Sequence, residues 1–251
     1  MRSQVTRVPS TLTVAQLSTP LGRRAWVCWP LYARTLKQTI EEYSADAMRF
    51  ALADAGDTIE DANFVDETAN AAILRMTKEL VWIEEMLSET TKGNLRTTAE
   101  EHPFADRVFA NAINTAIEAA REHFENMMFR EALKSGYYDL QSARDAYRLM
   151  CGGDAGMRAD LAARYVDVST LLLAPFCPHT CEHVWSTLLG RPGTVTKAGF
   201  PVGDAPDKVL TAASKYLDEM VSTIRKGIAK AGTTRGTARQ ALGFGVKGFR
   251  L

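Results

Sequence analysis

The chain has 251 residues with 30 Lys or Arg and 30 Asp or Glu, so its formal net charge at pH 7 is zero. The charges are segregated, because residues 1–40 and 220–251 contain Lys and Arg but no Asp or Glu, which leaves the middle acidic. An acidic middle argues against nucleic-acid contacts spread over the whole surface, since phosphates are bound by Lys and Arg. No apolar run approaches the roughly 18 residues of a membrane helix, and four cysteines give no disulfide framework, so we expect a soluble protein of a reducing compartment.

Residues 1–34 form a segment of their own. They are rich in Ser, Thr and Arg, contain no acidic residue, and include Pro9, Pro20 and Pro30. That composition is typical of an organellar transit peptide. We expect no stable fold in this segment.

Residues 35–64 are predicted to form two short helices and an acidic turn. Thr35 and Gln38 match a capping box, and Ser44 can accept a hydrogen bond from the first free amides of the second helix. Gly56 would end that helix in a left-handed conformation. The carboxylates around the turn would suit a metal ion, although their spacing lacks the ligand pattern of a calcium loop; a solvated turn is the alternative. They belong to Asp54, Asp57, Glu60 and Asp61.

Residues 65–203 carry the periodicity of a helical bundle. Apolar residues from Ala69 to Leu87 recur at intervals of three and four, which predicts a long amphipathic helix. The residues expected to face water on that helix are Lys78, Glu79, Glu84 and Glu85. A second helix is predicted to begin at Pro103. A third is predicted over residues 129–150, where Gly136 disfavours one straight rod.

Two more helices are predicted before a connector rich in Gly and Pro. The first contains Leu161 to Leu172 and the second begins at Pro178, while Thr194 to Lys197 could form a short strand. Residues 204–231 are predicted to form a C-terminal helix, and residues 232–251 a basic, disordered tail. Since strands do not alternate with helices, we expect an all-α bundle with disordered N- and C-terminal ends.

A zinc hydrolase is one functional interpretation. His179, Glu182 and His183 spell H-x-x-E-H, a pattern in which two histidines hold zinc and the glutamate acts as general base. Cys177 and Cys181 have the same four-residue spacing and could add sulfur ligands. A proline-initiated helix with no metal explains the same residues, and no third ligand stands nearby in the sequence.

Basic residues spaced one helical turn apart are the candidate RNA contacts. Such pairs can meet phosphates, and the alternative for each is an ion pair with Glu131, Asp139 or Asp145. The candidates are Arg130, Lys134, Arg144 and Arg148, followed by Arg75 and Lys78.

Three stretches resemble one known family. YSADAMRFALADAGDTIEDANF (43–64), ADRVFANAINTAIEAAREHFENMMFREALKSGYYDLQSARDAYRLM (105–150) and LLLAPFCPHTCEHVW (171–185) are similar to the segments that follow the KMSKS loop in leucyl-tRNA synthetases of the cytosolic and archaeal type. The resemblance covers about residues 35–226. These enzymes are class I aminoacyl-tRNA synthetases, which attach leucine to tRNA with ATP and Mg²⁺.

The resemblance implies a tRNA-binding portion without the catalytic domain. Residues 35–64 would contact the tRNA stem region, and residues 65–203 would form the anticodon-binding helical domain. The HIGH and KMSKS motifs are absent from the sequence, so no catalytic residue is carried over and no cofactor is expected in this chain. A non-catalytic tRNA-binding or assembly module is an alternative.

The resemblance also bears on partners, location and origin. It implies leucine-specific tRNA as partner, with contacts to a missing catalytic domain or to other synthetases, and no membrane. Cytoplasmic location is expected, with an organellar location as the alternative. Because the resemblance begins abruptly near Thr35, we expect a truncated or mis-spliced gene product in preference to a targeting peptide.

Overall fold

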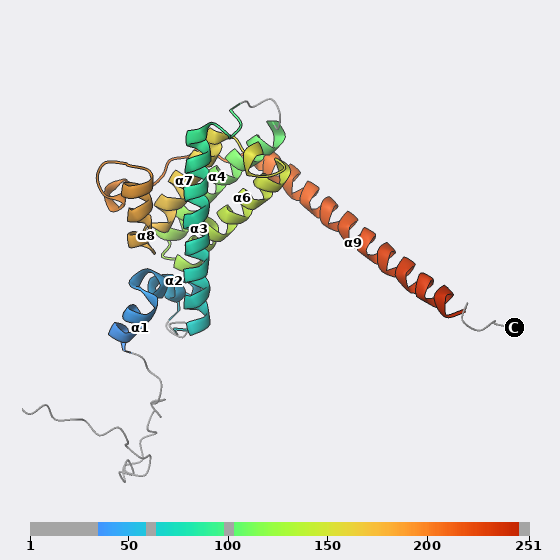
Figure 1. Ribbon diagram of the computed structural model, residues 1–251. Helices are drawn as coiled ribbons and strands as arrows, with labels where there is room; N and C mark the ends of the chain where they lie inside the picture. Colours follow the sequence, from blue (N-terminus) through green and yellow to red (C-terminus); the bar gives the residue numbers. More distant parts are fainter. Residues whose placement is uncertain (1–34, 59–63, 98–102, 246–251) are drawn as a thin grey trace, which may run out of the picture. The chain divides into compact units, whose positions relative to one another are not determined.

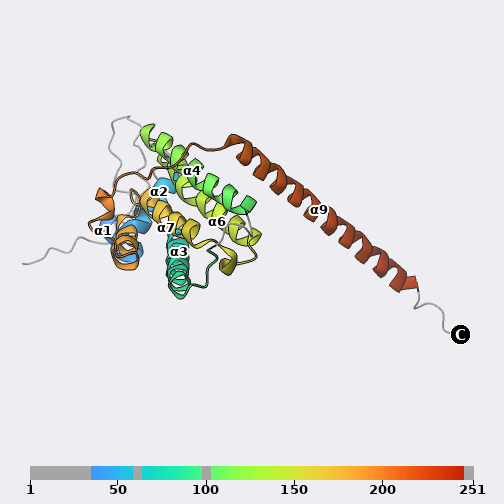
Figure 2. The same ribbon diagram turned by 90° about the horizontal axis from the view of Figure 1, so that it is seen from above.

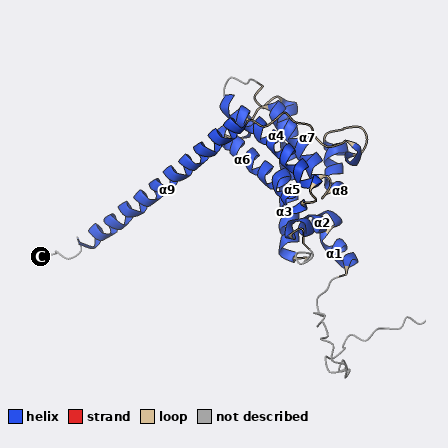
Figure 3. Cartoon of the chain, turned by 180° about the vertical axis from the view of Figure 1, so that it is seen from behind, coloured by secondary structure: helices blue, strands red, loops and turns tan. Residues whose placement is uncertain are grey.

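The computed structural model describes residues 35–58, 64–97 and 103–245, with side chains to residue 230 (Figure 1). From Leu36 onward the chain is one unit built from helices, and no strand occurs in these ranges (Figure 3). The longer helices are α1 (Leu36–Tyr43), α2 (Ala45–Ala55), α3 (Asp66–Lys92), α4 (Pro103–Glu125), α6 (Asp139–Met150), α7 (Ala159–Leu173) and α9 (Lys208–Gly245). The shorter turns are α5 (Phe129–Leu133), η2 (Lys134–Tyr138), η3 (Asp154–Gly156), α8 (Pro178–Glu182), η4 (His183–Leu188) and η5 (Val195–Lys197). The predicted all-α fold is confirmed.

The main core lies between α3, α4, α6 and α7. Helix α4 contacts both α6 and α7, and the three helices lie side by side (Figures 1 and 2). Phe109 of α4 stacks on Tyr147 of α6 with ring centroids 4.5 Å apart, and Trp82 of α3 meets Tyr165 of α7 edge to face. These aromatic side chains are buried, so they contribute both apolar area and specific geometry.

Helix α3 buries a face slightly different from the predicted one. Ala69, Met76 and Ile83 are buried as expected, but Leu80 and Leu87 are only partly covered. Glu79, predicted to face water, is buried, and this prediction was wrong. The reason is tertiary, because α6 and α7 supply hydrogen-bond donors to its carboxylate, as described below.

A π-helical turn, η2, interrupts the third predicted helix between α5 and α6. Gly136 lies in this turn, and a Cβ there would stand 3.3 Å from the Cβ of Leu172 and 3.5 Å from that of Ala120. The glycine therefore allows η2 to approach both α4 and α7 closely. The sequence signal against one straight rod is confirmed.

Asp46 in the first turn of α2 connects that helix to α8. Ser44 caps α2 as predicted, accepting a hydrogen bond from the Ala47 amide at 3.3 Å. The Asp46 carboxylate is buried and accepts hydrogen bonds from the amide and the hydroxyl of Thr180, at 2.7 and 2.8 Å. Arg49 also pairs with it. Residues 35–58 are thereby held against the bundle through charge-assisted hydrogen bonds.

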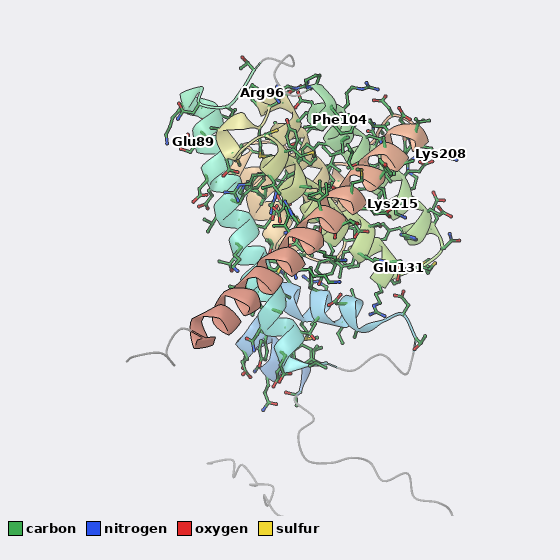
Figure 4. The ribbon with its side chains drawn as sticks, turned by 90° about the vertical axis from the view of Figure 1, so that its right-hand side faces the viewer. Glu89, Arg96, Phe104, Glu131, Lys208 and Lys215 are labelled. Atoms are coloured by element: carbon green, nitrogen blue, oxygen red, sulfur yellow. The ribbon has the colours of Figure 1, made fainter. Side chains whose placement is uncertain are left out.

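A second buried ionic group holds the segment between α3 and α4. The side chain of Arg96 pairs with Asp106 of α4 at 2.5 Å and donates to the Gly156 carbonyl at 2.9 Å. Tyr147 donates to the same carboxylate at 2.6 Å, and Arg158 lies 3.4 Å from it. Arg96 and Phe104, the second residue of α4, lie at the same end of the bundle (Figure 4).

Three predictions of local structure need correction. Residues 194–197 contain a 3-10 turn, η5, instead of a short strand, and the turn is closed by a hydrogen bond from Lys197 to Thr194. Gly56 ends α2 with φ 149° and ψ 176°, which is not the left-handed helical conformation. Helix α9 continues past residue 231 to Gly245 and takes in most of the segment expected to be disordered. Residues 1–34, Glu60 and Asp61 lie outside the described residues.

None of the described helices combines the length and the apolar character that crossing a bilayer demands.

Candidate nucleic-acid interface

A groove between α3 and α6 brings together three of the six predicted RNA contacts. Its volume is about 360 Å³, and it contains Arg75 and Lys78 from α3 and Arg144 from α6. We call it the α3–α6 groove. The other residues that line it are Ala71, Leu74, Glu79, Gln141 and Asp145.

Arg144 lies at the bottom of the groove, where two carboxylates and an aromatic ring contact its guanidinium. Its guanidinium pairs with Glu79 at 2.6 Å and with Asp145 at 2.9 Å, and it lies over the Trp82 ring, 4.4 Å from the centroid. Tyr165 donates to the other oxygen of Glu79 at 2.7 Å. Only 11% of the Arg144 side chain is exposed. Arg144 therefore joins α3, α6 and α7, and its pair with Asp145 matches the structural alternative to an RNA contact.

Burial and the neighbouring charges set the protonation of this network. Burial alone would lower the pKa of Arg144, but the interactions with Tyr165 and Glu79 outweigh it and raise the pKa of the guanidinium. Burial, reinforced by Glu79, raises the pKa of Tyr165 well above its ordinary value. At neutral pH Arg144 is therefore charged and Tyr165 is neutral, and the hydrogen bonds that both donate to Glu79 satisfy these buried groups.

The rim of the groove carries exposed basic side chains that phosphates can contact. Arg75 and Lys78 lie one turn apart on α3 and are both exposed. The guanidinium of Arg75 lies over the Tyr138 ring, 4.7 Å from its centroid, which restrains the side chain without neutralising it. Burial, followed by the nearby Asp54, raises the pKa of Tyr138 to about 12, so the ring keeps its proton. Both rim residues are thus available to an anionic partner.

The remaining candidates lie outside the groove. Lys134 lies 3.7 Å from Glu131, which is one of the predicted ion pairs. Arg148 at the end of α6 pairs with Asp154 at 2.7 Å, an acid that was not among the predicted partners. Arg130 is exposed at the start of α5, where its backbone amide donates to Asp57 at 3.1 Å. Of the six residues, two therefore lie on the groove rim (Arg75 and Lys78) and one lies in the buried network (Arg144). The other three occupy separate surface positions (Arg130, Lys134 and Arg148).

Sequence reasoning missed Glu79 and Tyr138, which hold two of the basic residues in place. Glu79 stands off the apolar stripe of α3, and nothing in its local sequence marks it as buried. Tyr138 follows Gly136 in a stretch that reads as ordinary helix. Their roles depend on partners on other helices, which periodicity along one helix does not report.

The H-x-x-E-H residues do not form a metal site in the structure. His179 is exposed, with its Nδ1 3.4 Å from a carboxylate oxygen of Asp46. Glu182 accepts a hydrogen bond from the Val195 amide at 2.8 Å and so holds the η5 turn. Burial raises the pKa of Cys177 to about 12, so its thiolate is disfavoured. In the part of the chain that the structure describes, no three His, Cys, Asp or Glu side chains gather as metal ligands, and the zinc interpretation gains no support.

Comparison with known proteins identifies the helical bundle. Residues 106–241 match the family described as the anticodon-binding domain of tRNA ligase. Over 197 residues the chain is 50% identical to the cytoplasmic leucine–tRNA ligase of Arabidopsis thaliana, covering 78% of this chain and 18% of that protein. For the cytoplasmic leucine–tRNA ligases of Pongo abelii and Saccharomyces cerevisiae the identities are 47% over 191 residues and 44% over 198 residues. The matches cover 76% of this chain and 16% of the Pongo abelii protein, and 78% of this chain and 18% of the Saccharomyces cerevisiae protein.

The chain thus spans less than a fifth of the length of these curated relatives. The family model covers α4 to α9, which includes α6 of the groove and the whole contact between α4, α6 and α7. The match therefore rests on the same helices that form the main core. This chain belongs to the anticodon-binding domain family of the tRNA ligases and is similar over most of its length to leucine–tRNA ligases.

Proposed function

We propose that this chain binds tRNA as the anticodon-binding portion of a leucine–tRNA ligase. The observation that carries the proposal is the family match over residues 106–241, together with the basic rim of the α3–α6 groove. Arg75 and Lys78 would contact phosphates, which position an RNA without reading its sequence. Arg144 would support binding indirectly, because it joins the helices that form the groove. Leucine-specific tRNA as substrate is supported by the names of the relatives.

Binding should be weakened and made less salt-dependent by removing the rim charges. In an Arg75→Gln/Lys78→Gln variant we expect the affinity for a tRNA transcript to fall about tenfold, and the slope of log K against log salt to become shallower by about 0.7–0.9 for each lost phosphate contact. Fluorescence anisotropy between 50 and 200 mM salt measures both.

The matched control is Lys92→Gln/Lys197→Gln, which removes the same charge from exposed positions outside the groove. It should bind within about twofold of the parent protein, as expected for surface charges that make no phosphate contact. Equal losses in the two variants would show a general charge effect and would exclude a site at the groove. Wild-type binding that does not change with salt would exclude phosphate contacts altogether.

We propose that the catalytic step takes place outside this helical bundle. The sequence contains neither HIGH nor KMSKS, and we propose that ATP and Mg²⁺ act in the catalytic domain, which would be a binding partner of this chain. Other synthetases are alternative partners. The cytoplasm is the proposed location on the names of the relatives, and an organelle is the alternative, given the acid-free first segment.

We expect the purified chain to show no leucine-dependent exchange of pyrophosphate into ATP. The reaction requires groups that bind ATP and stabilise the adenylate-forming transition state, and the HIGH and KMSKS motifs that would supply them do not occur in the sequence. A complete leucine–tRNA ligase assayed at the same concentration is the positive control. Exchange above background by the chain alone would show that it carries a catalytic site.

A further inference from the structure

Helix α9 is attached to the bundle through its first turns by polar contacts. The Asn111 side chain donates to the Asp207 carbonyl at 3.1 Å and to the Thr211 hydroxyl at 2.9 Å, and it accepts from the Asp207 amide at 2.7 Å. The Asp207 carboxylate caps the helix by accepting from the amides of Val209 and Leu210. These bonds fix where α9 begins.

Further along, the side chains of the helix are exposed, and Asp218 is the last that lines a cavity shared with α4 and α6. Every side chain from Tyr216 to Lys230 is exposed. A helix in this state presents both an apolar stripe and a polar face, and either can meet a partner. The apolar stripe consists of Leu217, Met220, Val221, Ile224 and Ile228.

The polar face opposite the stripe is basic. Lys208, Lys215 and Lys226 are separated by 7 and 11 residues, so at 3.6 residues per turn they lie within about 20° of one line along the helix. Lys230 follows one turn after Lys226 and lies about 40° from the line, whereas Arg225 lies about 100° from it, next to the apolar stripe. Figure 4 shows Lys208 and Lys215 on the first turns of α9. We call Lys208, Lys215, Lys226 and Lys230 the basic face of α9.

Charge also changes sharply along this helix. Glu219 is the last acidic residue of the chain, and residues 220–251 carry seven Lys or Arg. The helices that precede α9 hold the acidic excess of the protein. A polyanion would therefore be repelled by much of the bundle and attracted to the later turns of α9.

We propose that the basic face of α9 binds the phosphodiester backbone of the tRNA, as a second contact site beside the α3–α6 groove; this rests on the proposed function. Lys and Arg on exposed helical turns form sequence-independent phosphate contacts, and their number sets the salt dependence of binding. A straight helix offers them at 1.5 Å per residue, so Lys208 to Lys230 extend over about 33 Å.

A basic amphipathic helix can also lie on an anionic membrane, so the two partners must be weighed. Membrane-surface helices place Trp, Phe or Leu on the apolar face, and of these the stripe contains only Leu217, with no Trp or Phe between residues 208 and 230. Gly227 borders the stripe, and Glu219 lies on the line of lysines, where it weakens the attraction of either anionic partner. A phosphate backbone needs the basic face alone, so RNA fits the observations better.

The test uses the whole chain and a Lys215→Gln/Lys226→Gln/Lys230→Gln variant. These side chains are exposed, so circular dichroism and thermal unfolding should match the parent protein. We expect the affinity for a tRNA transcript to fall at least tenfold, and the slope against log salt to become shallower by about 2–3. The charge-matched control is Lys37→Gln/Lys92→Gln/Lys197→Gln, which should keep both values.

The outcomes separate this proposal from the proposed function. If the α9 variant binds tRNA like the parent while Arg75→Gln/Lys78→Gln is impaired, the α9 site is overturned and the proposed function stands. If the parent protein does not bind tRNA at all, both are overturned. Loss of binding to phosphatidylserine vesicles with unchanged tRNA binding would assign the basic face to a membrane and would also overturn the proposal.

Discussion

Replacing Glu79 with alanine is expected to lower the free energy of unfolding by about 3–5 kcal/mol, because it leaves the buried guanidinium of Arg144 without its buried carboxylate and with only the exposed Asp145 as a charged partner. The same change removes the acceptor of the Tyr165 hydroxyl, which is also buried. Urea denaturation at pH 7 measures the loss. The matched control is Glu84→Ala, an exposed position on the same helix, which should change stability by less than about 0.5 kcal/mol.

A double replacement shows whether the instability of Glu79→Ala comes from the unpaired charge of Arg144 or from a change in helix packing. In Glu79→Leu/Arg144→Met both charges are removed and the volume is kept, and such exchanges are often neutral or stabilising. We expect the double variant to lie within about 2 kcal/mol of the parent protein. A double variant as unstable as Glu79→Ala would mean that the helices need the charges themselves. A cost below about 1 kcal/mol for Glu79→Ala would contradict the buried network.

Asp106→Asn is the second change with a large expected effect, again about 3–5 kcal/mol at pH 7. Arg96, whose side chain is 4% exposed, would lose its ion pair with Asp106, while its hydrogen bond to the Gly156 carbonyl and its backbone bonds to Met157 and Ala159 would remain. Asp160→Asn is the matched control, because the Asp160 side chain is 66% exposed and also pairs with an arginine. Its cost should stay below about 1 kcal/mol.

Asp106 should also make the stability of the protein depend on pH in the acidic range. Burial alone would raise the pKa of Asp106, but the bonds from Arg96 and Tyr147 outweigh it and hold the pKa below its ordinary value of 3.8. A carboxyl with a depressed folded-state pKa stabilises the protein above its unfolded-state pKa, and that contribution is lost as the pH falls through the folded-state pKa. Denaturation curves at pH 7, 4 and 3 should therefore converge for the parent and Asp106→Asn. A difference that stays constant with pH would exclude this role.

Much of the fold follows from local sequence signals. Ser44, Pro103 and Pro178 each mark a helix start that the structure confirms, because caps and proline act within one turn. The apolar periodicity likewise predicted α3, α4 and α7 within a few residues. Such signals depend on neighbours in sequence, which is why they can be read without the structure.

The candidate site was less accessible to sequence reasoning. Arg144 and Arg75 look alike as basic residues on helices, but one is buried against Glu79 and the other is exposed on the groove rim. The difference arises from side chains more than 60 residues away in sequence, since Glu79 and Arg144 are 65 positions apart. Residue type and spacing alone cannot report contacts over that separation.

The π-helical turn at η2 explains why the basic pairs of the third predicted helix separate. In an uninterrupted α-helix, Arg130 and Arg144 are 14 residues apart and would lie on nearly the same side. A turn with i→i+5 bonding takes in about one extra residue, which rotates everything after it by about 100°. Arg130 and Lys134 accordingly remain exposed, while Arg144 turns into the core against α3. One inserted position in the helical repeat thus converts one residue of a basic stripe, Arg144, into an internal support for the bundle.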